Sequence, residues 1–299
     1  MKQQVIMVIF VLALLAACFS PWAGDETTIT VNLGSNSGFG RLLVYPPGGT
    51  NILNQLKYNV LFSGSGNAKT LTVTGGTIIK TTLSPGIWDI KIDAYLNGSF
   101  LYARGLGRTE VKSGKNNFAE ISMTKAFYEI GDAGPGSGLI FHVDTMGFLN
   151  TYTGTICHYL EAAADDEIGS GVPAAIPWGI TDTGYVTDVA IGSGRKNTAN
   201  IIEILQSQPV TNIYAARLCA AATYGGKSDW FLPSYDELVK MYENLYMLGY
   251  GTFPGGTILY WSSTCNIGFM EAWGFNFNSG SQAHDWMTSA RYTRAIRAF

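Results

Sequence analysis

The sequence predicts an α+β protein, in which an antiparallel β-sandwich precedes a second domain that combines strands with two helices. Its 299 residues are 46% hydrophobic and 14% charged, which is too apolar for a disordered chain and long enough for two ordinary domains. Short runs of alternating polarity fill residues 27–125, whereas residues 126–299 add two windows of helical periodicity. These observations place a domain boundary near residue 125.

The N-terminus predicts export and a lipid anchor. Lys2 precedes an apolar run from Val5 to Ala17, which is too short for a spanning helix. The run ends in "LAAC", which resembles a bacterial lipobox and implies cleavage before Cys18 and acylation of Cys18; the alternative is an ordinary signal with a chance cysteine. We expect a signal peptide at 1–17, a lipidated linker at 18–26, and a mature protein on the bacterial cell surface or outer membrane. No later stretch is long and apolar enough to cross a bilayer.

Residues 27–125 predict seven or eight strands. Runs such as "TTITVNL", "KYNVLF" and "WDIKIDAYL" are separated by turn signals such as "PPGG", "TGG" and "NGS" at intervals typical of a sandwich. The segment "LSPGIWDIKI" is similar to immunoglobulin-like modules of bacterial surface lipoproteins, where a Pro-Gly corner starts a strand with a buried tryptophan. The resemblance implies a spacer or stalk with Trp88 in its core.

Residues 126–299 predict strands at "GLIFHV" and "HYLEAA" and helices over 197–208 and 234–248. Ser234 and Glu237 have the spacing of a capping box. A core-facing stripe should follow at Leu238, Met241, Tyr242, Leu245 and Leu248. We expect Trp230 and Leu232 to be buried beside the second helix, and the alternation of 292–299 to form a closing strand. Arg294 and Arg297 should pair with carboxylates such as Asp229 or Glu237.

The two domains carry opposite charge. Residues 25–125 hold ten Lys or Arg against six Asp or Glu, a net charge of +4, whereas residues 126–299 hold eight against sixteen, a net charge of −8. Bulk attraction of the second domain to nucleic acid or sulfated polysaccharide is therefore disfavoured. A local basic patch from Arg291, Arg294 and Arg297 stays open at this point.

Several motifs of the second domain resemble a known family. They are "YEIGDAGPGSGLIFHVD", "YLEAAADDEIG", "PWG", "IGSGRKNTANII", "AARLCAAATYGGKSDWFLPSYDEL", "YWSST" and "RAIRAF". In this order they look like the Lcl C-terminal domain family and cover nearly all of 128–299. The resemblance implies a C-type lectin-like fold, of the variant shared with the formylglycine-generating enzyme, and a role in adhesion.

A second resemblance concerns the last strands. A lipobox, a preceding domain and a C-terminal lectin-like domain are similar to surface lipoproteins of the Treponema variable protein type, whose last strands are rewritten by a diversity-generating retroelement. Such systems mutate adenines, and residues 264–269, Gly274, Asn276, Asn278 and 283–285 all belong to the amino acids that this chemistry can produce. The alternative is an invariant domain.

The chain lacks the sequence patterns of several catalytic and metal sites. Calcium-dependent sugar binding in C-type lectins needs "EPN" or "QPD" with "WND", and none is present. For Asp165, Asp166 and Glu167, a solvated loop is favoured over a structural calcium site. The glycine-rich "GDAGPGSG" lacks the ending of a phosphate loop, so a tight turn before the next strand is favoured. We expect no metal and no cofactor.

Catalysis by a thiol is also disfavoured. The formylglycine-generating activity of the related fold requires a pair of cysteines, and the C-terminal region offers Cys265 alone. His284 has no evident third group to orient it toward that thiol, and His142 and His158 fit strand positions rather than metal-ligand spacing. Cys157 and Cys219 could form a disulfide, or all three cysteines could be small buried residues. We therefore assign no catalytic residue.

The favoured function is ligand binding at the cell surface, because aromatic residues with Asn, Ser and Gly combine rigid contacts with adaptable hydrogen bonds. The candidate ligand-binding residues are Thr264, Cys265, Asn266, Ile267, Phe269, Asn276, Asn278, His284, Asp285 and Trp286. The expected partner is a host or bacterial surface protein or glycan, with the membrane contacted through the lipid anchor. The alternative is a structural envelope lipoprotein in which these residues are buried, and an enzyme ranks third. Trp261, Trp273 and Phe299 are expected to be buried framework.

Overall fold

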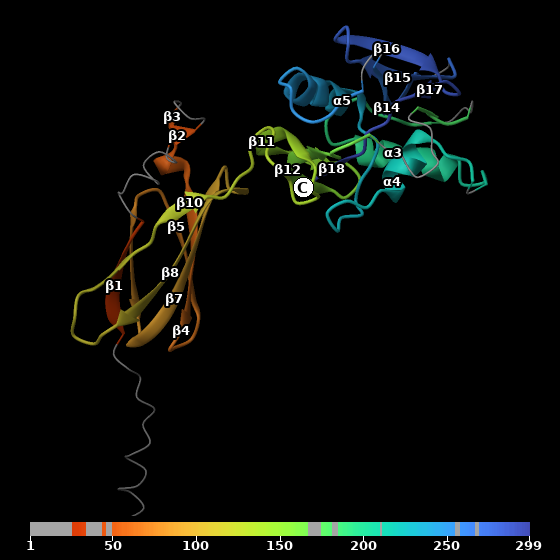
Figure 1. The fold of residues 1–299 in the computed structure, drawn as a ribbon. Helices are drawn as coiled ribbons and strands as arrows, with labels where there is room; N and C mark the ends of the chain where they lie inside the picture. Colours follow the sequence, from red (N-terminus) through yellow and green to blue (C-terminus); the bar gives the residue numbers. More distant parts are fainter. Residues whose placement is uncertain are drawn as a thin grey trace, which may run out of the picture. The chain divides into compact units, whose positions relative to one another are not determined.

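The structure is a computed structural model that describes residues 26–33, 44–45, 50–166, 175–180, 185–209, 211–254, 258–266 and 269–299. The chain divides into two compact units, Met1–Phe127 and Tyr128–Phe299, and the described residues are mostly strand with few helices (Figure 1). This composition fits the expected α+β class. The division falls two residues beyond position 125, since the ring of Phe127 stacks on that of Tyr102 in the first unit, with 5.0 Å between the ring centres. Residues 1–25, with the expected signal peptide and Cys18, lie outside the described residues.

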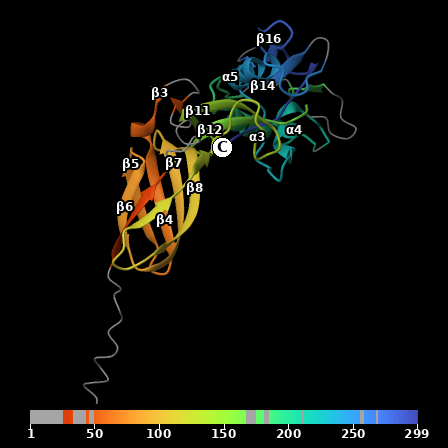
Figure 2. The ribbon, with the colours of Figure 1, turned by 60° about the vertical axis from the view of Figure 1, so that its left-hand side comes forward.

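Eight of the described strands in the N-terminal unit form two sheets (Figure 2). One sheet has the order β6-β1-β9, made of β1 (Thr27–Asn32), β6 (Ile78–Leu83) and β9 (Asn117–Glu120). The other has the order β10-β8-β7-β4-β5, made of β4 (Lys57–Gly64), β5 (Lys69–Thr74), β7 (Gly86–Leu96), β8 (Phe100–Val111) and β10 (Met123–Lys125). A short ladder joins β2 (Val44–Tyr45) to β3 (Thr50–Asn51), and η1 covers Leu53–Gln55.

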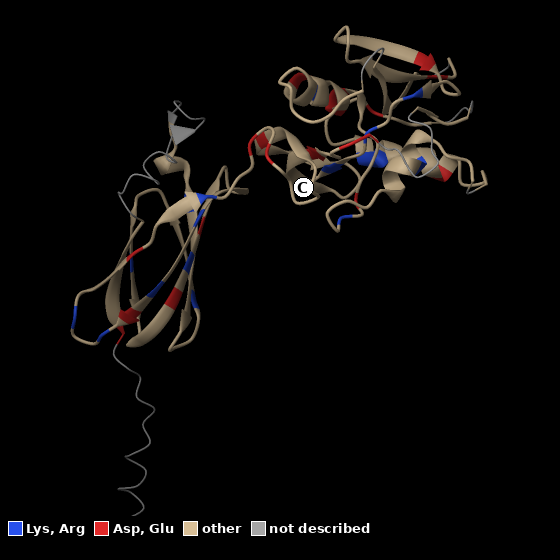
Figure 3. Ribbon diagram, viewed as in Figure 1, with Lys and Arg blue, Asp and Glu red and all other residues tan. Residues whose placement is uncertain are grey.

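One pairing in this unit differs from the expected antiparallel arrangement. Strand β1 pairs with β9 in parallel, because the long stretch of chain between them lets β9 return in the same direction. Every second residue of β4 and β7 is buried, and Trp88 on β7 is 1% exposed, as expected. On the outer face, charges of both signs lie along β7 and β8 (Figure 3), where Asp89 pairs with Arg108.

The C-terminal unit contains two three-stranded sheets. One has the order β11-β12-β18, made of β11 (Leu139–Asn150), β12 (Thr155–Ala162) and β18 (Ile296–Ala298), and the other has the order β14-β15-β16, made of β14 (Leu259–Asn266), β15 (Glu271–Asn276) and β16 (Ser281–Trp286). A small ladder joins β13 (Ile176–Pro177) to β17 (Ala290–Arg291). The helices are α3 (Gly194–Ile204), α4 (Ala215–Ala221) and α5 (Tyr235–Met241), which continues into a π-helical turn, η2 (Tyr242–Tyr246).

Helix α5 begins as the sequence predicts and ends earlier than expected. Ser234 and Glu237 form the predicted capping box, and Leu238, Met241 and Leu245 are fully buried. Leu248, however, is 59% exposed. The amide of Met247 bonds to the carbonyl of Tyr242, and this π-helical bond inserts an extra residue into the turn, which rotates the following positions away from the core.

Three further expectations need adjustment. Helix α3 begins at Gly194 rather than at 197 and ends at Ile204 rather than at 208. The seven-residue helix α4 was not expected, because a window of that length shows little periodicity. In the closing segment only β18 is a regular strand longer than two residues. Positions 293–298 are all buried rather than alternating: Ile296 is flanked by β12 and by Phe231, and Arg294 and Arg297 bind buried carboxylates. Trp230 and Leu232 are buried as predicted.

Within the described residues, no helix is long and apolar enough to cross a membrane.

Candidate functional site

The sheet β14-β15-β16 carries most of the candidate residues, and its two faces differ. Trp261, Cys265 and Ala272 face one hydrophobic cluster, while Tyr260 and Phe275 face the other. On the second face, α5 covers Phe275, whose ring lies 6.2 Å from that of Tyr235 and 5.0 Å from that of Tyr242. The same face continues past α5 toward the edge strand β16, where the side chains become accessible.

Aromatic and polar side chains are accessible on this part of the face and in the turn that precedes β15. Glu271 and Trp273 of β15 lie directly opposite Trp286 and His284 of β16, and opposite residues in a ladder share a face. Phe269 and Met270, in the turn before β15, are 64% and 47% exposed, and Trp286 is 56% exposed. We call Phe269, Met270, Glu271, Trp273, His284 and Trp286 the aromatic surface.

Hydrogen bonds hold the polar members of the aromatic surface in place. The Nδ1 atom of His284 lies 2.9 Å from an oxygen of Glu271, which also accepts a bond from the side-chain amide of Asn266 at 3.1 Å. The Trp273 ring packs edge-on against the imidazole of His284 at 5.5 Å. Trp273 is partly exposed rather than buried as expected, because it lies on the part of the face that α5 leaves uncovered. These contacts present a fixed arrangement of rings, an imidazole and a carboxylate.

Two candidate ligand-binding residues are buried. Thr264 is 3% exposed, and its hydroxyl accepts a bond from the Tyr235 amide and donates to the Asp188 carbonyl, both at 3.1 Å. Cys265 is 7% exposed, and its sulfur lies 3.2 Å from the hydroxyl of Thr187. Both side chains therefore secure β14 to its neighbours and cannot form part of an accessible surface. Ile267 lies outside the described residues.

Other candidates maintain the turns of this sheet. The side-chain oxygen of Asn276 accepts bonds from the amides of Asn278 and Ser279, and that of Asn278 accepts from Ile258. Both asparagines lie at the end of the sheet away from Trp286. Asp285 is partly buried and pairs with Arg291. The aromatic surface therefore keeps three of the ten residues that the sequence indicated, Phe269, His284 and Trp286, and Asn266 supports it through its bond to Glu271.

The structure also bears on the cysteines and histidines. Cys157, Cys219 and Cys265 are buried and form no disulfide with one another, so the Cys157–Cys219 bridge considered from the sequence is absent. Cys265 contacts Thr187 whereas His284 contacts Glu271, so these contacts do not make a thiol–imidazole pair. His158 Nδ1 lies 2.7 Å from the Asp144 carbonyl, as expected of a satisfied strand histidine. No group of three or more metal-ligating side chains occurs among the described residues.

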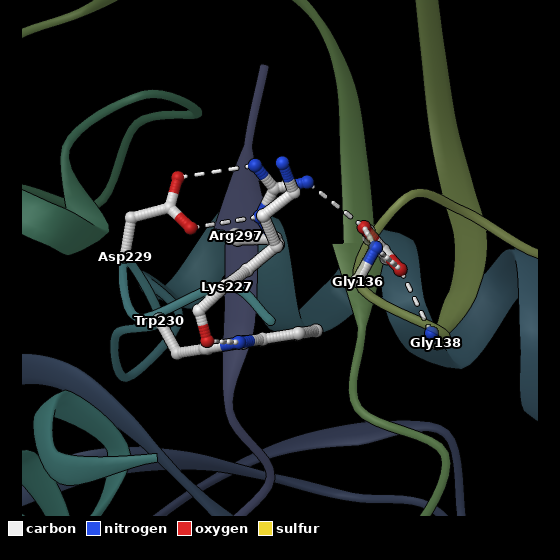
Figure 4. A network of polar contacts seen from close by, with 7 residues as sticks. Gly136, Gly138, Lys227, Asp229, Trp230 and Arg297 are labelled. Atoms are coloured by element: carbon white, nitrogen blue, oxygen red, sulfur yellow. Dashed lines mark hydrogen bonds and ion pairs between the residues drawn. The ribbon is translucent and has the colours of Figure 1, made fainter. Parts of the chain in front are cut away.

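A buried ionic network ties the C-terminus to the rest of the unit (Figure 4). Arg297 binds both oxygens of Asp229, at 3.0 and 3.1 Å, and an oxygen of Glu161 at 3.0 Å. Glu161 also accepts bonds from the amides of Gly136 and Gly138. The glycine-rich loop 131–138 therefore wraps a buried carboxylate, and a Cβ at Gly138 would lie 2.0 Å from the carbonyl oxygen of Ala162.

Each of the three C-terminal arginines left open as a basic patch pairs with a carboxylate of the unit. Arg297 pairs with Asp229 as predicted, and Arg294 pairs with Asp166 at 2.7 Å rather than with Asp229 or Glu237. Asp166 also accepts a bond from the Tyr260 hydroxyl and is buried, so it is not part of a solvated loop. Arg291 pairs with Asp285. Burial raises the pKa of Asp229, but Arg297 outweighs this effect and holds the pKa below its ordinary value.

Two clefts in the described part of the unit are lined by none of the candidate residues. The larger, about 520 Å³, lies along one face of α3 and is lined by Tyr152, Arg195, Ile202, Glu203, Asp229 and Trp230 among others. The smaller, about 410 Å³, includes Asp188, Ser193 and Lys196. In the larger cleft, the Arg195 guanidinium lies 5.2 Å from the centre of the Tyr152 ring. A ligand could bind in these clefts instead, so a test of the aromatic surface needs a control substitution in a cleft.

Sequence reasoning missed Met270, Glu271 and Trp273 as members of the aromatic surface. Glu271 lies next to the candidate segments 264–269 and 274–286, and hairpin pairing would have placed it opposite Trp286. Met270 adopts a left-handed backbone with φ of 54°, which no sequence signal indicates for methionine.

No protein-family model matches this chain, and no curated protein matches it significantly.

Proposed function

We propose that the protein is a lipid-anchored adhesion protein of the bacterial cell surface and that its C-terminal unit binds a partner through the aromatic surface. In this proposal the C-terminal unit is a C-type lectin-like domain of the Lcl C-terminal type, and the N-terminal unit is an immunoglobulin-like spacer. The observation that carries the proposal is the exposure of Phe269 and Trp286, at 64% and 56%, on one end of a well-paired sheet.

This exposure favours binding over a structural role. In a structural envelope component the same aromatics would be core residues, yet the rings of Phe269 and Trp286 have most of their surface accessible. Exposed Trp and Phe side chains gain hydrophobic free energy when a partner covers them, and Trp in particular is enriched among residues that dominate binding energy. Glu271 and His284 add fixed polar groups that set orientation.

Attachment of the protein to host cells or extracellular matrix tests the proposal. We expect Phe269→Ala and Trp286→Ala each to weaken attachment by about 2 kcal/mol, or roughly thirtyfold, while the fold is kept. The matched control is Tyr152→Ala, which removes an aromatic side chain of similar exposure (54%) from the larger cleft. Attachment that survives both substitutions on the aromatic surface but is lost with Tyr152→Ala would move the site to the cleft.

We further propose that this surface is diversified by a retroelement. Exposure indicates which codons should vary: those for the accessible positions Asn266, Phe269 and His284 should differ among clonal isolates. Codons for Thr264 and Cys265 should differ much less, because their buried side chains hold β14 in place. Sequencing the locus across isolates tests this version, and codons 264–286 that vary no more than their neighbours would contradict it.

A further inference from the structure

Among the described strands, β16 lies at one edge of its sheet. It follows β15 in the order β14-β15-β16, and no other described strand pairs with it. Edge strands expose backbone N–H and C=O groups, and proteins commonly protect them with lysine, proline, bulges or very short length. The six residues of β16, SQAHDW, contain neither lysine nor proline and pair with β15 without a register shift.

The hydrogen-bond phase of the hairpin shows which backbone groups are unpaired. The Met287 amide bonds to the Met270 carbonyl, one position beyond the pair of Trp286 and Glu271. Because inward and outward groups alternate along an antiparallel strand, Ser281, Ala283 and Asp285 bond to β15. The backbone groups of Gln282, His284 and Trp286 therefore point away from β15.

The backbone N–H and C=O of Trp286 that point away from β15 bond to nearby residues, whereas those of Gln282 and His284 bond to no described residue. The Trp286 amide bonds to the carboxylate of Asp285, and its carbonyl accepts from Ser289, both at 2.8 Å. No described residue bonds to the outward amide or carbonyl of Gln282 or of His284. Two donors and two acceptors thus lie on a regular strand beside the aromatic surface.

Two other edge strands of the C-terminal unit bond to neighbouring loops. On β14, the amides of Trp261 and Ser263 bond to the carbonyls of Tyr292 and Pro233. On β18, Ile296 exchanges two bonds with Phe231. Against this pattern, β16 combines an uncovered edge with exposed aromatic side chains.

We infer that the partner of the aromatic surface is a polypeptide that adds an extended strand to β16. The inference rests on the proposed function and makes it more specific, because strand addition requires a peptide backbone and a glycan has none. Main-chain bonds to Gln282 and His284 supply affinity, and the side chains of His284 and Trp286 select alternate residues of the added strand. The net charge of −8 of residues 126–299, with Glu271 beside the edge, favours a segment that carries Lys or Arg.

The test uses a phage-displayed library of random 12-residue peptides as the probe. It is selected on the mature chain with Cys18→Ser, which stays unacylated and soluble. The critical variant is Gln282→Pro, since proline lacks the outward amide but leaves the bonds to β15, and proline is tolerated on such edges. The matched control is Gln282→Ala, which removes the side chain and keeps the amide. Thermal unfolding checks that both variants fold.

We expect the selected peptides to be rich in Lys or Arg and to bind Gln282→Ala as they bind the wild-type chain. Their affinity for Gln282→Pro should fall about tenfold or more, because a bonding group in the contact is left without its partner. Should Gln282→Pro unfold, N-methylation of alternate peptide residues provides the same test on the wild-type chain. In that test, methylation of peptide residues whose amides bond to β16 should lower the affinity. Methylation of the intervening peptide residues, whose amides point away from β16, should not.

Three results would overturn the inference: no peptide is selected, the selected peptides bind Gln282→Pro as well as wild type, or N-methylation has no alternating effect. A wild-type dimer that Gln282→Pro converts to a monomer in sedimentation would also overturn it, since a second copy would then occupy the edge. Failure of the proposed function is distinct: attachment to cells or matrix would survive Trp286→Ala. Loss of attachment with Trp286→Ala but not with Gln282→Pro would keep the aromatic surface and reject strand addition.

Discussion

Replacing Arg297 by methionine should destabilise the C-terminal unit strongly. The side chain of Arg297 is 6% exposed and binds the carboxylates of Glu161, which is fully buried, and Asp229, which is 31% exposed. Methionine keeps much of the aliphatic volume but leaves Glu161 buried without its cation. Breaking a buried ion pair from one side costs about 3–5 kcal/mol. Because the amides of Gly136 and Gly138 still bond to Glu161, we expect the lower end, about 3 kcal/mol.

Differential scanning calorimetry of the whole chain measures this effect. For a domain of this size each kcal/mol lowers the melting temperature by about 2–4 °C, so Arg297→Met should lower that of the C-terminal unit by about 6–12 °C. The matched control is Lys240→Met, which breaks the exposed pair with Glu243 and should cost at most about 0.5 kcal/mol. A shift for Arg297→Met no larger than that of Lys240→Met would refute the reasoning.

Three more predictions concern Asp229, the cap of α5 and the buried cysteines. Because the pKa of Asp229 is lower in the folded than in the unfolded chain, where it is about 4, the ionised carboxylate stabilises the folded state above that pH. Stability should therefore fall as the pH drops below about 4, and Arg297→Met should make this fall smaller in acid titrations followed by circular dichroism. Ser234→Ala removes the hydroxyl of the capping box and should cost about 1 kcal/mol in urea unfolding, whereas Ser279→Ala, at an exposed turn, should cost little. Cys157, Cys219 and Cys265 are buried and not joined by disulfides, so they should react with a thiol reagent only after unfolding, and reductant should leave the melting temperature unchanged.

Local sequence patterns predicted the elements whose energetics are local. The strands of the first unit follow from alternation and turn residues, and the start of α5 follows from the capping box at Ser234 and Glu237. The end of α5 was mispredicted because its π-helical turn depends on tertiary packing rather than on periodicity. Arg294 binds a buried carboxylate as expected, but its partner Asp166 was not among those named, since Asp166 is distant in sequence and reaches Arg294 only through the fold.

The candidate site was predicted in part because exposure is a tertiary property. Composition indicated the segment correctly, yet Thr264 and Cys265 are as polar or small as their exposed neighbours and only packing against Thr187 and Asp188 removes them from the surface. Asn276 and Asn278 match binding residues in chemistry but stabilise a turn. Strand register, which places Glu271 beside Trp286, decides which side chains can touch one partner.

Hydroxyl-radical footprinting of the protein, free and attached to host matrix, tests the central claim most directly. Phe269, Met270 and Trp286 report on the aromatic surface, while Met146 and Tyr152, 71% and 54% exposed, report on another part of the unit. We predict that attachment lowers oxidation of the first three residues and leaves that of Met146 and Tyr152 unchanged. Unchanged oxidation of Phe269, Met270 and Trp286 in the attached protein would contradict the account.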